Sequence, residues 1–324
     1  ERKRREIIMK KSIQKLFAAL FVMAATLILA PSVDAKAALT QVNPAKDSIT
    51  VQWEPEDRVI NYMVYVGTSS SDAALAATLP ATATSYKIAN LPAGVERYVK
   101  VEYTYKSSYG DKVYDSSVGS IWDARTIPVV VNNVKQERWY YYLKSFNVEW
   151  DKLEAADSYE YELYNSKGKK LKSGTTSSTS ISHSKKVSNN MIYKVRVRAT
   201  SKVAGQTYTT AWSPYCYCFT QPRVKSVKVS GNKLTVKWQK ITGATGYDIY
   251  VSTKKTKGYK KVKSVGKNAS SVTIKKFKGK KFKSSKRYYV YVAATKKANG
   301  KKYDSGRLYY WNSKEFPPSI LLHN

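Results

Sequence analysis

The stretch that decides the fold is Ile49-Thr-Val-Gln-Trp53 followed by Tyr62, because the same pattern occurs three times along the chain. The other two copies are Phe146-Asn-Val-Glu-Trp150 with Tyr159, and Leu234-Thr-Val-Lys-Trp238 with Tyr247. In every copy the tyrosine follows the tryptophan by nine residues, and the copies begin 97 and 88 residues apart. A period of about 90 residues is too long for a solenoid unit and suits a small all-β domain. The sequence therefore predicts three similar β-sandwiches in tandem.

Each copy continues with the alternation that strands of a sandwich need. Valines stand at every second position later in each copy: Val99 and Val101, Val195 and Val197, Val290 and Val292. Each run leads into a turn that contains glycine, such as Asn299-Gly300, and such turns between alternating strands indicate hairpins. Strict alternation buries one face of a strand and exposes the other, as two packed antiparallel sheets require. Helical periodicity is confined to the extreme N-terminus.

Together these residues resemble the fibronectin type III family. The carriers are the tryptophan on the second strand, the tyrosine that opens the third, and a Tyr-x-Val-x-Val-x-Ala strand at residues 193–199 and 288–294. Repeat 1 departs from the pattern, because Arg97 stands where the strand's first tyrosine is expected and Tyr98 comes one place late. A β-bulge or a lost hydrogen bond is expected there. The resemblance implies immunoglobulin-like, seven-stranded sandwiches used for binding or spacing, although a fold alone does not settle function.

The chain divides into an N-terminal leader and three repeats. Residues 1–37 contain a basic segment around Met9 and an apolar run at residues 16–30, followed by small-residue cleavage sites ending at Ala35 and Ala37. This pattern is typical of a secretory signal peptide, with an uncleaved anchor as the alternative. Repeat 1 is predicted at residues 38–128, repeat 2 at 129–221 and a lysine-rich repeat 3 at 222–318. The protein is therefore expected to be secreted, extracellular and associated with a cell surface.

Cysteine and histidine are scarce in this chain. Cys216 and Cys218 lie two apart on a predicted strand, which puts both on one face in a geometry unsuited to a mutual disulfide. We expect them to pack as small apolar side chains. The two histidines, His183 and His323, are too few to complete a metal site with these cysteines. No metal and no cofactor are predicted.

The carboxylates offer little for catalysis. Glu160 and Glu162 share the outward face of one predicted strand, and we expect a solvated face there rather than a glycosidase pair. Neither histidine accompanies a candidate nucleophile, so no catalytic triad can be assembled. The Ser/Thr-rich segment at residues 173–182 is expected to be a flexible loop. The sequence predicts that the protein is not an enzyme.

Positive charge is concentrated in the last repeat. Residues 222–324 carry 27 basic and 3 acidic side chains, a net of +24, whereas residues 38–128 carry 8 and 10, a net of −2. The lysines form two runs, which we call the first and second lysine runs. The first run consists of Lys254, Lys255, Lys257, Lys260, Lys261 and Lys263, and the second of Lys275, Lys276, Lys278, Lys280, Lys281 and Lys283. Clustered like charge favours a polyanion-binding surface, although lysines also protect edge strands from aggregation.

A run of aromatic side chains precedes the tryptophan strand of repeat 2. It consists of Trp139, Tyr140, Tyr141 and Tyr142. Consecutive residues of a strand point to opposite faces, so these rings cannot all enter one core. Packing against repeat 1 is the first interpretation, and contact with a sugar or a partner protein is the second.

These observations favour a secreted bacterial protein of three tandem fibronectin type III-like domains that serves adhesion. Repeat 3 would bind an anionic cell-wall polymer or a sulfated glycan, and the other repeats would act as spacers or contact another surface protein. No module that reads nucleic-acid bases is recognised, and no membrane span is expected after signal cleavage. The alternative is an accessory fragment of a larger extracellular polysaccharide or cell-wall hydrolase.

Overall fold

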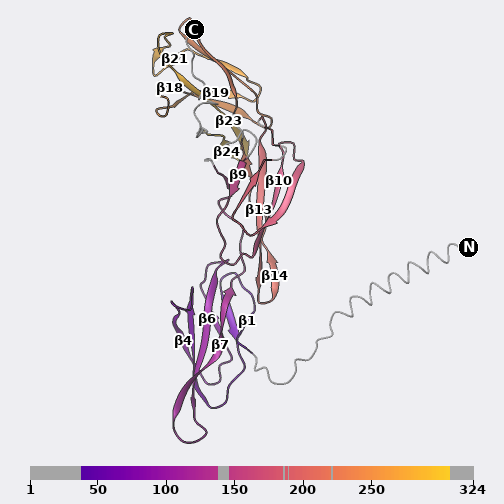
Figure 1. Ribbon diagram of the computed structural model, residues 1–324, viewed down its shortest axis with the longest axis vertical. Coiled ribbons are helices and arrows are strands. Elements are labelled where there is room, and N and C mark those ends of the chain that lie inside the picture. Colours follow the sequence, from indigo (N-terminus) through magenta and orange to yellow (C-terminus); the bar gives the residue numbers. More distant parts are fainter. Residues whose placement is uncertain (1–37, 138–145, 185–186, 189, 220–221, 307–324) are drawn as a thin grey trace, which may run out of the picture. The chain divides into compact units, whose positions relative to one another are not determined.

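The computed structural model describes residues 38–137, 146–184, 187–188, 190–219 and 222–306. All regular elements in these residues are β-strands, so the described part of the chain contains no helix that could cross a membrane. The strands form three successive pairs of sheets, with one further two-stranded sheet in the last pair, and these coincide with the three sequence copies (Figure 1). The leader at residues 1–37 and the aromatic run at residues 139–142 lie outside the described residues.

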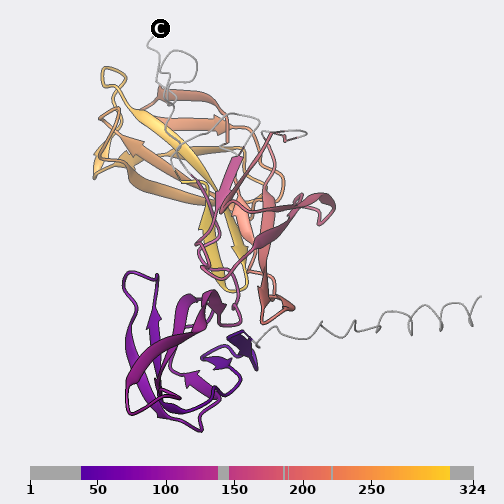
Figure 2. The same ribbon diagram turned by 60° about the horizontal axis from the view of Figure 1, so that its bottom comes forward.

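Repeat 1 consists of a three-stranded and a four-stranded sheet, which Figure 2 shows as two layers. Its strands are β1 (Thr40–Val42), β2 (Ile49–Gln52), β3 (Val59–Gly67), β4 (Ala74–Pro80), β5 (Ser85–Ile88), β6 (Glu96–Lys106) and β7 (Val113–Arg125). The sheet orders are β1-β2-β5 and β4-β3-β6-β7, and every pairing is antiparallel. The alternation predicted from the sequence is therefore satisfied by two packed sheets.

Repeat 2 has the same plan with a divided last strand. Its strands are β8 (Lys135–Gln136), β9 (Phe146–Glu149), β10 (Ser158–Tyr164), β11 (Lys170–Thr176), β12 (Ser180–His183), β13 (Tyr193–Val203), β14 (Gln206–Thr209) and β15 (Cys216–Cys218). One sheet has the order β12-β9-β8, and the other has β11-β10-β13-β14 with β15 also paired to β13. The expectation of a flexible Ser/Thr-rich loop is wrong, because residues 173–182 contribute to β11 and β12. Their exposed hydroxyl side chains alternate with inward residues such as Ile181, which packs against the core.

Repeat 3 repeats the plan and adds a small hairpin. Its strands are β16 (Val224–Ser230), β17 (Lys233–Trp238), β18 (Gly246–Ser252), β19 (Lys260–Gly266), β20 (Ser271–Ile274), β21 (Lys276–Phe277), β22 (Lys280–Lys281), β23 (Tyr289–Ala298) and β24 (Lys301–Asp304). The orders are β16-β17-β20 and β19-β18-β23-β24, with β21 and β22 forming a separate two-stranded sheet.

The Trp–Tyr pair occupies the centre of each core. The ring centroids of Trp53 and Tyr62 are 5.3 Å apart, and those of the pairs in repeats 2 and 3 are both 5.5 Å apart. Three separate clusters of buried apolar residues contain one pair each. Both sheets of each repeat contribute to its cluster, and the cluster of repeat 3 also includes Ile192 and Phe219 of repeat 2.

The tyrosine of each pair also closes the loop between the second and third strands. Its hydroxyl oxygen accepts a hydrogen bond from the backbone N–H six residues earlier, in all three repeats. The donors and N···O distances are Glu56 (2.8 Å), Leu153 (2.9 Å) and Ile241 (2.8 Å). The nine-residue spacing therefore places the same hydrogen bond in the loop between the second and third strands of each repeat. We call this loop, at residues 53–58, 150–157 and 239–245, the BC loop.

The irregularity expected in repeat 1 is present as a bulge. The register between β6 and β7 shifts between Arg97 and Val99. Tyr98 is 7% exposed and packs against Trp122, with ring centroids 4.9 Å apart, whereas Val99 belongs to the core of repeat 1. In repeats 2 and 3 the tyrosine at this corner instead accepts a backbone hydrogen bond, from Ser188 N–H (2.6 Å) and from Lys283 N–H (3.2 Å). We call the five residues just before this position, at 92–96, 188–192 and 283–287, the EF corner of each repeat.

The two cysteines behave as the sequence predicts. Cys216 and Cys218 are both free and buried within the core of repeat 2. Burial, together with the neighbouring Cys216, raises the pKa of the Cys218 thiol well above its ordinary value. The Cys218 thiol therefore stays protonated and apolar in character at neutral pH.

Candidate polyanion-binding surface

The first lysine run lies on the edge strand of repeat 3 and on the turn that leads to it. β18 ends at Ser252, the turn covers residues 253–259, and β19 forms the sheet edge. All six lysines of this run are exposed. The turn is fixed by Ser252, whose hydroxyl donates to the carbonyl of Lys257 (2.7 Å) and accepts from the N–H of Lys254 (2.9 Å). The lysines are thus presented on an ordered backbone.

Tyrosine rings lie beneath this turn on the outer face of the four-stranded sheet. Tyr250 and Tyr291 are stacked with centroids 4.5 Å apart, and Tyr259 packs on Tyr291 at 5.1 Å. The Tyr259 hydroxyl donates to the carbonyl of Lys255 at 2.9 Å. The three rings therefore hold the turn that carries the first lysine run against the outer face of the sheet.

The second lysine run surrounds the small hairpin between β20 and β23. Phe277 and Phe282 anchor this segment in the core of repeat 3, with exposed fractions of 7% and 0%. Lys278 and Gly279 form its turn, both at positive φ. The residues between the anchors point outward, and all six lysines of the run are exposed. Lys276 pairs directly with Lys281 across the two strands, which places two like charges side by side.

The two lysine runs belong to different sheets but reach the same end of repeat 3. Ser252, the last residue of β18, pairs with Tyr289, the first residue of β23. The turn that carries part of the first run begins directly after Ser252. The segment that carries the second run leads into β23 and ends directly before Tyr289. Figure 1 shows the corresponding labels, β18 and β21, at one end of the repeat. The two runs are therefore both connected to this end of the sheet.

Acidic side chains near the two runs are few: Asp248 is buried, and Asp304 is exposed on β24, near enough to Tyr250 to interact with it electrostatically. The sequence between residues 249 and 303 contains no aspartate or glutamate. Asp248 is 3% exposed, and its carboxylate binds Lys302 Nζ (2.7 Å) and Ser264 Oγ (2.6 Å), with Lys261 Nζ at 3.8 Å. Burial alone raises the pKa of Asp248, but Lys302, Ser264 and Lys261 outweigh it, so the pKa lies below its usual value. Lys261 is therefore partly engaged within the fold.

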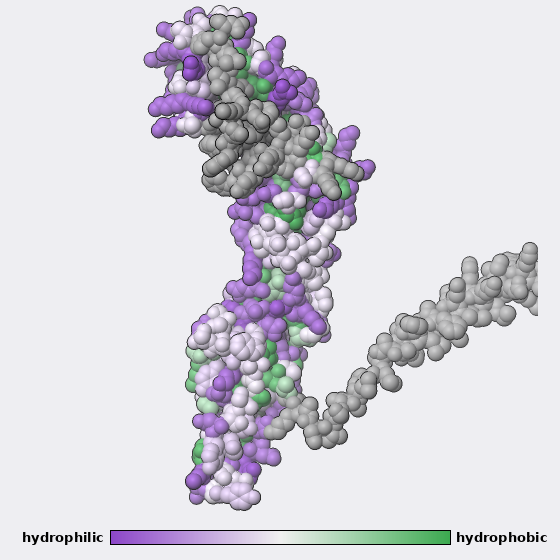
Figure 3. All heavy atoms as spheres, viewed as in Figure 1, coloured by the Kyte–Doolittle hydropathy of each residue, from purple (hydrophilic) through white to green (hydrophobic). Residues whose placement is uncertain are grey.

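The visible described surface of repeat 3 is largely polar. In Figure 3 hydrophilic colours dominate the described surface of repeat 3. Lysines that lie side by side make the local electrostatic potential more positive, and a positive potential attracts polyanions. Binding then releases counterions that were condensed on the polyanion. Lysine presents a compact point charge rather than a bidentate fork, which suits attraction to a repeated anionic group.

Glu160 and Glu162 of repeat 2 have structural roles. The expectation of a solvated face is wrong for Glu162, which is 8% exposed because residues from the β14–β15 connection cover it. Its carboxylate binds Lys170 Nζ (2.5 Å), Arg196 Nη2 (2.5 Å) and the Tyr164 hydroxyl (2.6 Å). The guanidinium groups of Arg196 and Arg198 flank the ring of Trp212, 4.6 and 4.5 Å from its centroid.

Glu160 completes the same layer through two contacts with Arg198, at 3.1 and 2.7 Å. The pKa of Glu162 lies at about 2: burial raises it, and hydrogen bonds from Lys170, Tyr164 and Arg196 lower it by more. A carboxylate that holds its negative charge so firmly is unsuited to act as a general acid at neutral pH. Within the described residues, no three histidine, cysteine or acidic side chains lie close enough to hold a metal ion.

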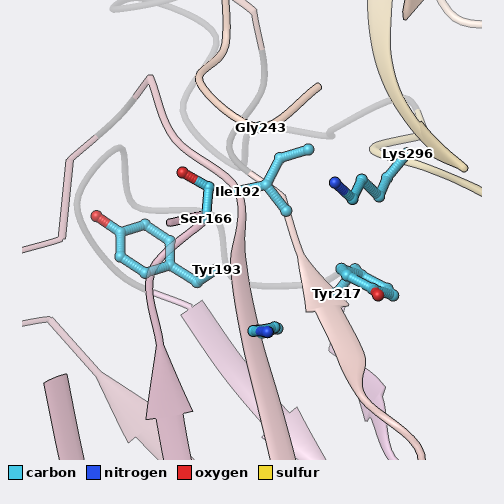
Figure 4. A pocket seen from close by; sticks show the side chains of 7 residues that line it. Ser166, Ile192, Tyr193, Tyr217, Gly243 and Lys296 are labelled. Carbon is cyan, nitrogen blue, oxygen red and sulfur yellow. The ribbon is translucent and has the colours of Figure 1, made fainter. Parts of the chain in front are cut away.

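A small cavity lies where repeat 2 meets the BC loop of repeat 3 (Figure 4). Its volume is about 80 Å³, below the roughly 300–1,000 Å³ of small-molecule sites. The lining residues are Ser166, Ile192, Tyr193, Lys194, Tyr217, Gly243 and Lys296. Gly243 has φ +91°, and a Cβ added there would lie 2.6 Å from the Cβ of Ser166. The cavity is therefore a feature of a close junction rather than a ligand site.

Comparison with known proteins gives similarity to solved structures only. No family model and no curated protein matches the chain. A crystal structure of the chicken CNTN1 FN1–FN3 domains aligns at a TM-score of 0.32 and 16% identity, covering 83% of this chain and 97% of that one. A two-domain fibronectin type III segment of chicken tenascin aligns at 0.30 and 18%, covering 58% and 100%. The strand orders and the Trp–Tyr pattern of this chain carry the description of its fold.

Proposed function

We propose that this chain is a secreted, non-catalytic bacterial adhesion protein of three tandem fibronectin type III-like domains. Repeat 3 attaches to an anionic polymer of the cell wall or to a sulfated glycan, and repeats 1 and 2 act as spacers or contact another surface protein. Modules of this kind are typically binding or spacing units, and the Trp–Tyr cores support three separately folded domains. The leader at residues 1–37 supports export.

One observation carries the assignment of the polymer to repeat 3. Twelve exposed lysines converge on one end of a single repeat, within a stretch of 55 residues that contains no acidic side chain. At physiological ionic strength the Debye length is about 8 Å, so charges cooperate only when they are close together. Cross-strand neighbours such as Lys276 and Lys281 meet this condition.

The test compares two variants of the full chain that remove the same number of charges from repeat 3. The site variant changes Lys275, Lys276, Lys278, Lys280 and Lys281 to Gln. The control variant changes five other exposed lysines of repeat 3 to Gln: Lys225, Lys228, Lys237, Lys240 and Lys267. Binding to heparin and to purified teichoic acid is measured at several salt concentrations.

We expect the site variant to bind about tenfold or more weakly and to show a shallower dependence on salt, because fewer counterions are released. The control variant should stay within about threefold of the parent, since its lysines lie away from the convergent end. Equal losses in both variants would mean that only the net charge matters. Unchanged binding in the site variant would remove the proposed site.

A further inference from the structure

The junctions between successive repeats follow one rule. At each junction the BC loop of the later repeat docks on the EF corner of the earlier one. The N–H of Ala155 donates to the carbonyl of Gly94 at 3.0 Å where repeat 2 meets repeat 1. Where repeat 3 meets repeat 2, the N–H of Thr242 donates to the carbonyl of Asn190 at 2.7 Å. The same two surfaces are therefore used twice.

The second contact of each junction joins equivalent positions, although the donors of the first contact, Ala155 and Thr242, stand four and five residues before their core tyrosines. Ile192 N–H donates to the backbone carbonyl of Thr242 at 2.9 Å, and Glu96 N–H donates to the side-chain carboxylate of Glu154 at 3.4 Å. Thr242 and Glu154 both stand five residues before the core tyrosine of their repeat. Ile192 stands directly before Tyr193, as Glu96 stands directly before Arg97. Equivalent positions thus meet at both junctions.

The junction between repeats 1 and 2 also pairs opposite charges. The carboxylate of Glu154 in the BC loop lies 3.5 Å from the guanidinium of Arg97 on the earlier repeat. Asp157, at the end of the same loop, binds Arg125 of the earlier repeat at 2.6 Å. An acidic BC loop facing a basic neighbouring surface is therefore a contact that this chain already makes.

Two of these surfaces have no counterpart within the described chain, and their charges are complementary. The BC loop of repeat 1 has the sequence Glu54-Pro-Glu-Asp57, in which Glu54 and Asp57 are exposed. Asp57 stands five residues before Tyr62, the position of Glu154 in repeat 2. The EF corner of repeat 3 consists of Lys283-Ser-Ser-Lys-Arg287, and all five residues are exposed.

We propose that copies of this chain associate head to tail, with the BC loop of repeat 1 in one copy docked on the EF corner of repeat 3 in the next. Asp57 then takes the place of Glu154, and the backbone N–H of Arg287 takes the place of that of Glu96. The carbonyl of Ser285 corresponds to that of Gly94. The side chains of Lys283, Lys286 and Arg287 supply the positive charge that Arg97 and Arg125 supply inside the chain.

The charge distribution makes this contact favourable despite the positive net charge of the whole chain. Repeat 1 has a net charge of −2 and repeat 3 of +24, so the two docked repeats attract each other. Repulsion between more distant parts is screened beyond a Debye length of about 8 Å. A contact between two different surfaces of the same molecule is heterologous, and it produces open chains or closed rings. The contact is small and charged, so it should weaken with added salt.

The test uses two charge-reversed variants of the full chain, studied by sedimentation velocity over a range of protein concentrations. One variant carries Glu54→Lys and Asp57→Lys, and the other carries Lys286→Glu and Arg287→Glu. Each variant alone presents like charges at the contact, so its self-association should weaken by at least about tenfold. An equimolar mixture of the two again offers opposite charges, and association should return.

A matched control carries Lys225→Glu and Lys237→Glu. These residues are exposed on β16 and β17, next to each other through the pairing of Ser226 with Lys237, and away from the EF corner. This control undergoes the same charge change as the second variant and should associate like the parent. Thermal unfolding of every variant, followed by circular dichroism, checks that the folds are retained.

The outcomes separate this proposal from polymer binding by repeat 3. Association bridged by a contaminating polyanion would persist in the Glu54→Lys, Asp57→Lys variant, whose repeat 3 is unchanged. That persistence would overturn the head-to-tail contact. A parent chain that stays monomeric at low salt, or a mixture that stays monomeric when both variants are folded, would also overturn it, and neither result bears on heparin binding.

Discussion

Removing the hydroxyl of the core tyrosine should cost most in repeat 3. In the Tyr247→Phe variant the N–H of Ile241 loses its acceptor, which lies 2.8 Å away in the parent. Ile241 is 4% exposed and Tyr247 is 1% exposed, so water cannot easily take the place of the hydroxyl. Burial also raises the pKa of Tyr247, which agrees with a phenol withdrawn from solvent. A buried donor without a partner costs about 1–3 kcal/mol.

The other repeats supply internal comparisons for this prediction. Tyr62→Phe frees the N–H of Glu56, and Tyr159→Phe frees that of Leu153, but both of these residues are only half-buried. Water can replace the lost acceptor there, so the cost should stay near the ordinary net value of about 0.5–1.5 kcal/mol. The three variants remove the same atom from the same motif, and they differ only in the burial of the donor.

Amide hydrogen exchange read by mass spectrometry measures each repeat separately within the full chain. Peptides from β17 and β18 should exchange faster in the Tyr247→Phe variant, while peptides from repeats 1 and 2 keep their parental rates. For a domain of about 100 residues, 1 kcal/mol corresponds to a shift of about 4–8 °C in Tm, which thermal unfolding detects. If Tyr62→Phe destabilised its repeat as much as Tyr247→Phe does, burial of the donor would not be the controlling factor.

Two further predictions concern charge burial and the junction. The pKa of Glu162, about 2 in the folded chain against an ordinary 4.5, means that its stabilising contribution is complete above about pH 4.5 and is lost as the pH falls toward 2. Acid unfolding of repeat 2 should therefore shift in Glu162→Gln and keep its parental pH dependence over this range in the control Glu160→Gln. Gly243→Ala should destabilise repeat 3 at its contact with repeat 2 by about 1–3 kcal/mol, because alanine is strained at φ +91° and its Cβ meets Ser166. Gly266→Ala, which has open space around it, is the control, and exchange rates of residues 190–192 report the result.

The sequence predicts the sandwiches well because each of their determinants is local. A strand that alternates apolar and polar residues has only one way to face a core, and the fixed Trp–Tyr spacing marks the same loop three times. The exposure of the twelve lysines follows from the same reasoning, since Ile274 and Phe277 occupy the inward positions beside them. The glycine turns are likewise local, as the positive φ of Asn299 and Gly300 shows.

Features that depend on distant partners could not be predicted in this way. Glu162 is buried because Arg196 lies opposite it on β13, and Trp212 and Tyr215 pack over that arginine. Only the folded sheet brings these four residues together. The convergence of the two lysine runs likewise depends on the pairing of Ser252 with Tyr289. The composition of residues 173–182 predicts a loop, but strands with one exposed face accept serine and threonine readily, and this segment contributes to β11 and β12.

The residues in the three BC loops indicate that the internal junctions are permanent, whereas the proposed contact between copies is reversible. The N–H bound by the core tyrosine belongs to Leu153 in repeat 2 and Ile241 in repeat 3. Leu153 lies beside Gly94 of repeat 1, and Ile241 shares a buried cluster with Ile192 of repeat 2, so both apolar side chains adjoin the preceding repeat. Glu56 occupies this position in repeat 1. A carboxylate tolerates water when the contact is open, whereas an exposed leucine or isoleucine there would leave an apolar patch. The substitution therefore suits a surface that binds a charged partner reversibly, with a strength set by the ionic strength of its surroundings.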